Sequence, residues 1–102
     1  WSCQMAEIHE IVRAYRTAQK LSLRDFAQQI NQNLINTVVS YGTVHRWEDT
    51  EKPYEPDMWL LFECLAMYQD WRSEWAAACL KAMWPDLFNR GVVCVNLPNN
   101  NK

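Results

Sequence analysis

The amino-acid sequence predicts an all-α fold of about five helices, and three observations support this class. The chain has 102 residues, of which 49% are apolar and 22% charged, as in a single globular domain. It contains only two glycines, whereas a β-sandwich or barrel needs many tight turns. Several segments place apolar residues three and four positions apart after a capping residue, which is typical of amphipathic helices. We therefore expect one helical domain at 1–90 and a short irregular tail at 91–102.

The first two helices are predicted at 5–19 and about 23–30. In the first, one face carries the apolar residues Met5, Ile8, Ile11, Val12, Tyr15 and Ala18. Ser22 is a good N-cap for the second helix, and Asp25 can return the hydrogen bond as in a capping box. Its apolar stripe consists of Phe26, Ala27 and Ile30.

The segment 31–39 interrupts the helical pattern. Its three asparagines disfavour the interior of a helix. Four of its side chains are nevertheless too apolar for free solvent, namely Leu34, Ile35, Val38 and Val39. We expect either a compact loop or a ragged extension of the second helix that tucks some of these side chains against the domain.

A third helix is predicted at 41–49, with Ser40 as its N-cap. Val39 and Val44 occupy the positions of a hydrophobic staple around this cap. The spacing directs Val44 and Trp47 inward, which leaves the polar side of the helix on the surface.

The second half of the chain predicts two more helices, at 58–68 and 71–83, with Asp57 and Asp70 as their N-caps. Pro53 and Pro56 keep the preceding segment out of helical geometry. After the fifth helix, "PDLF" could form one more turn and "VVCV" a short strand. The Trp-rich C-terminal helices then occupy 69–90.

The sequence shows no motif that is typical of a catalytic site or a metal site. The four cysteines, Cys3, Cys64, Cys79 and Cys94, show no CxxC spacing, so we expect no metal site and no cofactor. Neither a catalytic triad, paired carboxylates nor a phosphate loop is present, so an enzyme is not expected. Nothing suggests secretion, which favours a reducing cytoplasm.

Three motifs in order, "LSLRDFA", "VSYGTVHRWE" and "EKPYEPDMWLLFECLA", resemble helix-turn-helix proteins of the phage repressor and Cro type. Residues matching the family's second and third helices are Leu21, Ser22, Phe26, Ala27, Val39, Ser40, Thr43, Val44, Trp47 and Glu48. The resemblance implies a helix-turn-helix core within 5–68, a bacterial or phage origin, and a cytoplasmic DNA-binding regulator, such as a repressor.

One departure from the family concerns the connection between its second and third helices. Ala27 and Trp47 are twenty positions apart here, whereas the family spacing is about thirteen. The additional residues fall in 31–39, where the family has a tight Gly turn. This enlarged connection either bulges outward, reaches toward DNA, or blocks it.

The resemblance implies that the third helix enters the major groove of DNA. Its candidate base contacts are Tyr41, Gly42, Thr43, His45 and Arg46, and its candidate phosphate contacts are Ser22, Arg24, Ser40 and Lys52. Several of these residues have a structural alternative: Tyr41 can pack on Trp47 or a loop, and Arg46 can pair with Glu48, Asp49 or another surface carboxylate. Arg16 and Arg24 can be ordinary solvated charges, and Glu48 can hold an Arg or a loop amide of the domain.

The charge balance limits the kind of DNA binding to expect. Residues 1–52 contain six basic and six acidic groups, and the whole chain has a net charge of −2. Only the docking face must be positive, so site-specific binding remains possible while binding to random DNA should be weak. The competing hypothesis is a protein–protein interaction module that does not bind DNA.

A homodimer is also expected, because one module of this size buries little DNA surface. The C-terminal half holds more large apolar side chains than a small core can absorb, namely Leu60, Leu61, Trp71, Trp75, Trp84, Leu87 and Phe88. Contact between two copies through these helices would bury the surplus. The alternative is that the tryptophans fold back over the first three helices.

Overall fold

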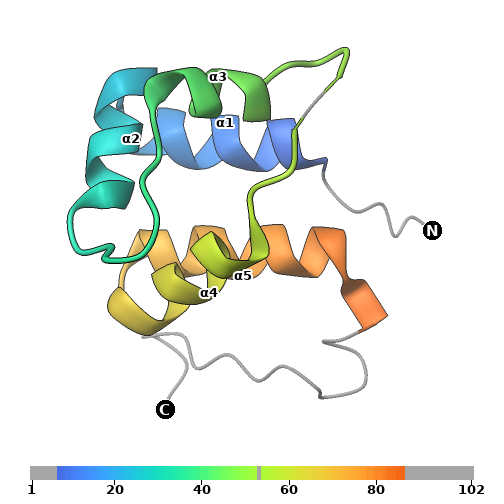
Figure 1. The fold of residues 1–102 in the computed structure, drawn as a ribbon. Coiled ribbons are helices and arrows are strands. Elements are labelled where there is room, and N and C mark those ends of the chain that lie inside the picture. Colours follow the sequence, from blue (N-terminus) through green and yellow to red (C-terminus); the bar gives the residue numbers. More distant parts are fainter. Residues whose placement is uncertain (1–6, 53, 87–102) are drawn as a thin grey trace.

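The computed structural model describes residues 7–52 and 54–86, and within these residues it contains five helices and no strand (Figure 1). The helices are α1 (Ile8–Ala18), α2 (Leu23–Asn31), α3 (Tyr41–Trp47), α4 (Met58–Met67) and α5 (Trp71–Met83). The expected all-α class with about five helices is therefore confirmed. Predicted features at 1–6, at 53 and at 87–102, including the strand "VVCV" and the tail, lie outside the described residues.

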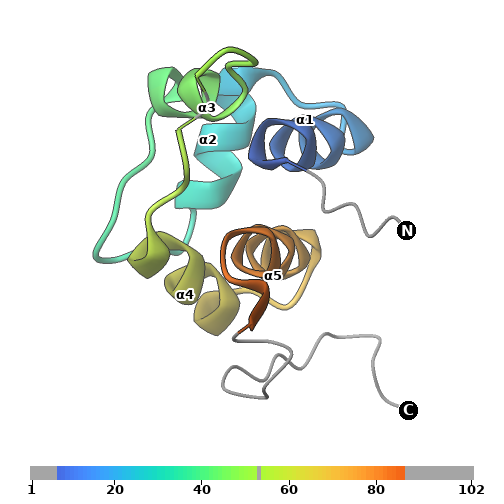
Figure 2. The same cartoon turned by 90° about the vertical axis from the view of Figure 1, so that its right-hand side faces the viewer.

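The helices pack in two connected groups. α2 packs against α3, α4 packs against α5, and α1 contacts both α3 and α5. The axes of α1 and α5 are nearly parallel, with the chain running in opposite directions along them (Figure 1), and both helices are seen nearly end-on in Figure 2. This arrangement makes α1 the bridge between the α2–α3 pair and the α4–α5 pair.

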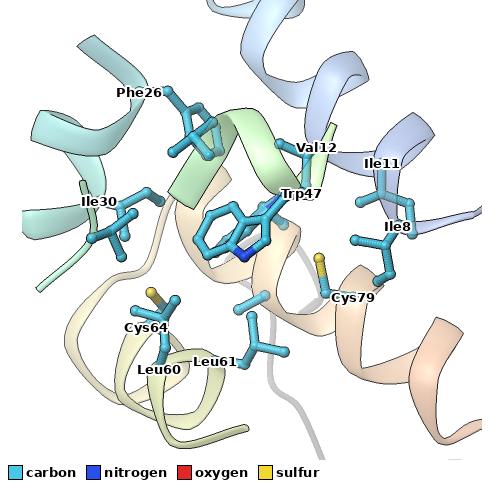
Figure 3. Packing of buried hydrophobic residues seen from close by; sticks show 14 of the residues in the cluster. Ile8, Ile11, Val12, Phe26, Ile30, Trp47, Leu60, Leu61, Cys64 and Cys79 are labelled. Atoms are coloured by element: carbon cyan, nitrogen blue, oxygen red, sulfur yellow. The ribbon is translucent and has the colours of Figure 1, made fainter. Parts of the chain in front are cut away.

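Trp47 lies at the centre of one hydrophobic core to which all five helices contribute (Figure 3). Its side chain is 2% exposed, and its ring centroid lies 5.6 Å from that of Trp75 on α5. Phe26 of α2 meets Trp75 edge-on at 5.6 Å, an arrangement that aromatic rings favour. α3 is thus held by a buried indole, as its spacing predicts, and its opposite side remains available to solvent.

Side-chain caps begin most of the helices as expected. Ser22 Oγ accepts from the Asp25 amide, Ser40 Oγ from the Thr43 amide, and Asp70 from the Arg72 amide. Asp57 occupies the N-cap position of α4 without a side-chain cap bond.

α3 ends at Trp47, two residues earlier than predicted. The reason is a turn centred on Asp49, whose carboxylate accepts hydrogen bonds from the amides of Glu51 and Lys52. Such local bonds offer the backbone an alternative to continuing the helix.

α1 ends in a Schellman motif in which Lys20 adopts a φ of 58°. The Leu21 amide donates to the Arg16 carbonyl and the Lys20 amide to that of Thr17, both at 3.0 Å. The left-handed conformation is unfavourable for a residue with a Cβ, and glycine is the usual choice.

The apolar surplus expected in the C-terminal half is largely absorbed by the chain itself. Leu60, Leu61 and Trp75 are buried, and Trp71 and Trp84 are half-buried against the core. These five side chains therefore pack on the core of the chain itself, because α5 lies between α1 and α4 and buries its apolar residues against both. Leu87 and Phe88 lie outside the described residues.

Across residues 7–52 and 54–86, every helix is too short or too polar to cross a bilayer.

Candidate nucleic-acid interface

The connection between α2 and α3 is a loop at 32–40 that is closed at its base by a side-chain amide. Asn31, the last residue of α2, accepts from the Val39 amide at 2.8 Å and donates to the Val39 carbonyl at 2.7 Å. These two bonds join the end of α2 to the residue that precedes the cap of α3. The extra residues therefore leave the two helices held together at a fixed point.

The loop is also fastened to α4 through Glu63. One carboxylate oxygen accepts from the amides of Ile35 and Asn36 at 2.7 and 3.1 Å, and the other accepts from the Thr37 hydroxyl at 3.0 Å. The two amide donors stabilise the ionised form, so the pKa of Glu63 lies below its usual value of 4.5.

A second fastening joins the end of α2 to the start of α5. The Tyr68 hydroxyl donates to the Ile30 carbonyl and accepts from the Asn33 amide. The Arg72 guanidinium stacks over the Tyr68 ring at 3.8 Å and donates to the Gln29 carbonyl. Arg72 is itself held by the carboxylate of Asp70, whose pKa is lowered by that contact.

The loop consequently runs beside α4 and does not cover the outward side of α3 (Figures 1 and 2). Of its apolar residues, Val39 is buried and Leu34 half-buried. Ile35 and Val38 are 78% and 87% exposed, so the expectation that some of these four side chains pack against the domain holds for Val39 and Leu34 and not for the other two. The path of the loop is determined by hydrogen bonds of its backbone, from the Ile35 and Asn36 amides to Glu63 and from the Val39 amide to Asn31. On this path the side chains of Ile35 and Val38 stay in solvent.

The expected base-contacting residues lie on one accessible surface of α3. Tyr41, His45 and Arg46 are exposed, whereas Gly42 and Thr43 are half-buried. The Thr43 hydroxyl lies 3.1 Å from Ser40 Oγ, so part of its hydrogen-bonding capacity is used within the chain. A Cβ added at Gly42 would come no nearer than 3.7 Å to Ser40 Oγ, so packing within the described chain does not require glycine there.

Two arginines on this surface are supported by tyrosine rings. The Arg24 guanidinium of α2 lies 4.5 Å from the centroid of Tyr41, and that of Arg46 lies 5.5 Å from the centroid of Tyr54. Neither arginine forms an ion pair within the residues that the structure describes. In that part of the chain each cation is therefore supported by a ring and is not paired with a carboxylate.

The alternative partner of Arg46, Glu48, is occupied elsewhere. The buried Glu48 carboxylate accepts from Arg16 Nε at 2.6 Å and Arg16 Nη2 at 2.9 Å, and from Arg13 Nε at 3.4 Å. Glu48 thus holds arginines of the domain, as one of the sequence alternatives proposed. Arg16 is not a solvated charge, since it also donates to the Leu21 carbonyl and its pKa is raised chiefly by the hydrogen bond to Glu48.

The expected phosphate contacts lie at the edges of the α2–α3 surface. Ser22 and Ser40 are exposed caps whose hydroxyls serve the helix starts, and Arg24 and Lys52 are exposed. Sequence reasoning missed Tyr54, whose amide also donates to the Arg46 carbonyl at 3.1 Å. A tyrosine between two prolines carries no periodic signal that would reveal such a contact.

Negative charge borders the same surface. The Asp49 carboxylate lies in the turn after α3, and its pKa is lowered by the amides of Glu51 and Lys52, so it stays ionised at neutral pH. Glu55 and Asp57 line a hollow that also reaches Thr43. Tyr54, the ring that supports Arg46, lines the same hollow, so these carboxylates border the side of Arg46, whereas Arg24 lies beside Tyr41.

Within the described ranges, no group of three or more His, Cys, Asp or Glu side chains is placed to hold a metal ion. Cys64 and Cys79 are free and buried, and burial raises the pKa of the Cys64 thiol to about 12. Comparison of the chain with protein-family models, curated proteins and solved structures finds no match.

Proposed function

We propose that this protein is a sequence-specific DNA-binding regulator of the phage repressor and Cro type, with α3 as its recognition helix. The observation that carries the proposal is the pair of guanidinium groups of Arg24 and Arg46, each supported by a tyrosine ring beside α3 and neither in an ion pair within residues 7–52 and 54–86. A largely buried charge with a structural role needs a partner of opposite sign, as Arg16 has in Glu48. An arginine positioned by a ring and left without a carboxylate is suited to an external anion or base.

Arg46 is the residue we assign to base recognition. A guanidinium can donate two parallel hydrogen bonds to O6 and N7 of guanine in the major groove. Stacking on Tyr54 restricts the side chain, which reduces the entropy lost on binding. Tyr41 and His45 lie exposed beside it, and the half-buried Gly42 and Thr43 complete the surface.

Arg24 and Lys52 are assigned to the DNA backbone. Arg24 belongs to the first turn of α2, where the polar cap of Ser22 also faces solvent. Contacts to phosphate position a protein on the duplex without reading its sequence. Two copies on a palindromic site would supply the remaining affinity, and a homodimer through the C-terminal helices stays a prediction to be tested by sedimentation at tens of micromolar.

The test is selection of bound duplexes from a random DNA pool at low salt, followed by substitution of Arg46. Arg46→Ala should weaken binding to the selected site by about 1–3 kcal/mol and relax the preference at one base pair. Arg24→Ala should weaken binding to all sequences alike. Lys81→Ala, an exposed charge on α5, is the matched control and should leave binding unchanged.

The competing function is a protein-binding module of the same fold that does not bind DNA. The carboxylates of Glu55 and Asp57 near Thr43 favour it. Failure to enrich any sequence from the pool, or equal binding by the parent chain and Arg46→Ala, would reject the regulator in favour of this module.

A further inference from the structure

Two adjoining hollows form a groove along one side of the molecule, between the α2–α3 loop and the chain entering α4. The first, of about 560 Å³, lies between Asn36 and Thr37 on one side and Asp57, Trp59, Phe62 and Glu63 on the other. The second, of about 360 Å³, extends from Val38 to Tyr54 and Glu55. Thr37 and Asp57 line both, so the hollows lie next to each other, and we call them together the side groove.

Exposed apolar side chains gather at the side groove. Seven large hydrophobic side chains are exposed in the described part of the chain, of which Val38, Tyr54 and Trp59 line the two hollows and Ile35 and Met58 lie in the same two segments. Trp59 is 70% exposed and rests against the ring of Phe62 at 6.4 Å. Clustered exposed apolar residues around a groove indicate a surface that another molecule covers.

The charges of the side groove restrict what that molecule can be. Its lining contains the carboxylates of Glu55, Asp57 and Glu63, and no Lys or Arg among the residues described. None of the three carboxylates takes part in an ion pair within 7–52 and 54–86. A ligand must therefore combine apolar groups for the rim with positive charges for the carboxylates.

Two other occupants fit these observations poorly. Nucleic acid would bring phosphates against three carboxylates. A second copy related by a two-fold axis would bring the same acidic groove against itself, because such an interface uses one surface twice. Like charges brought together in this way cost several kcal/mol.

We infer that the side groove is a docking site for a partner protein segment in which Lys or Arg alternates with large apolar residues. The apolar side chains of that segment would cover Trp59 and Val38, and its cations would face Asp57 and Glu55. The inference goes beyond the proposed DNA binding. The second hollow also reaches Thr43, one of the proposed base contacts, whereas Trp59 lines the first hollow and is not among the DNA-contacting residues, so substitution of Trp59 tests the docking site separately.

The test begins with a displayed library of random 16-residue peptides selected on the full chain. The enriched peptides should be basic and rich in large apolar residues, and the peptide of highest affinity should shift the NMR signals of Trp59 and Val38 in the labelled protein. Trp59→Ala should weaken its binding by about tenfold or more, as expected for a central aromatic residue. Met67→Ala is the matched control, because Met67 is exposed on the same helix and lines neither hollow.

The charge requirement is tested by the double variant Glu55→Gln and Asp57→Asn. Asparagine is as good an N-cap as aspartate, so the start of α4 should be preserved. Binding of the basic peptide should weaken and lose most of its salt dependence, whereas the control Asp86→Asn should leave both unchanged. Acidic or neutral enriched peptides, no enrichment, an unchanged affinity in Trp59→Ala, or sedimentation as a dimer that Trp59→Ala abolishes would each overturn the inference.

Discussion

Lys20 occupies a backbone conformation that its side chain does not favour. Its φ of 58° closes the Schellman motif after α1, a position where glycine is free of the Cβ penalty. Lys20→Gly should therefore raise the free energy of unfolding by about 0.5–1 kcal/mol, measured by urea denaturation. Lys20→Ala removes the same charge but keeps the Cβ, so it should give no such gain. Equal stabilisation by both variants would show that the backbone is not the cause.

Glu48 connects the end of α3 to α1 through Arg16. Removing its carboxylate leaves a largely buried guanidinium, since the Arg16 side chain is only 19% exposed. Glu48→Ala should therefore lower the free energy of unfolding by about 2–4 kcal/mol, seen as a lower urea midpoint with an unchanged slope.

Arg13 provides the control for this prediction. It reaches the same carboxylate at 3.4 Å, but its side chain is 60% exposed. Arg13→Ala should cost less than about 0.5 kcal/mol, because solvent screens an exposed ion pair. Comparable losses in Glu48→Ala and Arg13→Ala would contradict the assignment of Arg16 as the main partner.

At the scale of elements, the loop at 32–40 should lose its hydrogen bonds to Glu63 at acidic pH before the helices unfold. The pKa of Glu63 is lower in the folded than in the unfolded protein. The stability that its carboxylate adds is therefore fully present above the ordinary pKa of 4.5, and it is lost as the pH falls through the lower pKa of the folded state. NMR signals of the Ile35 and Asn36 amides should shift in that acidic window. Glu63→Gln should abolish the shift, whereas the Asn33 amide, bound to the Tyr68 hydroxyl, should not follow it.

The helices could be predicted from sequence because their signals are local. α2, α4 and α5 fall within a residue of their predicted ends, and Trp47 is buried as its spacing requires. The path of the loop could not be predicted, because it depends on Glu63, Tyr68 and Arg72, which lie 26 or more positions from their partners. The contact of Arg46 with Tyr54 could not be predicted either, because it depends on the turn between the end of α3 and Tyr54, which has no helical or strand periodicity.

At the scale of the whole molecule, the number of phosphate contacts should set the salt dependence of DNA binding. If a dimer makes about six phosphate contacts, its affinity for a selected site should fall by about a thousandfold between 50 and 200 mM salt. Fluorescence anisotropy across that range measures the slope. Micromolar affinity for random DNA at physiological salt would contradict the prediction, because the carboxylates beside α3 disfavour indiscriminate contact with phosphates.

The side-chain amide of Asn31 has a consequence for how this chain tolerates change. It forms hydrogen bonds with both the amide and the carbonyl of Val39, and so joins Asn31 directly to Val39 across the seven residues that separate them in sequence. Segments of other lengths and compositions could be exchanged above that clasp without re-orienting the helices on either side. The segment 32–38 could in this sense be replaced by another sequence with a different binding specificity, while the packing of α2 and α3 stays the same.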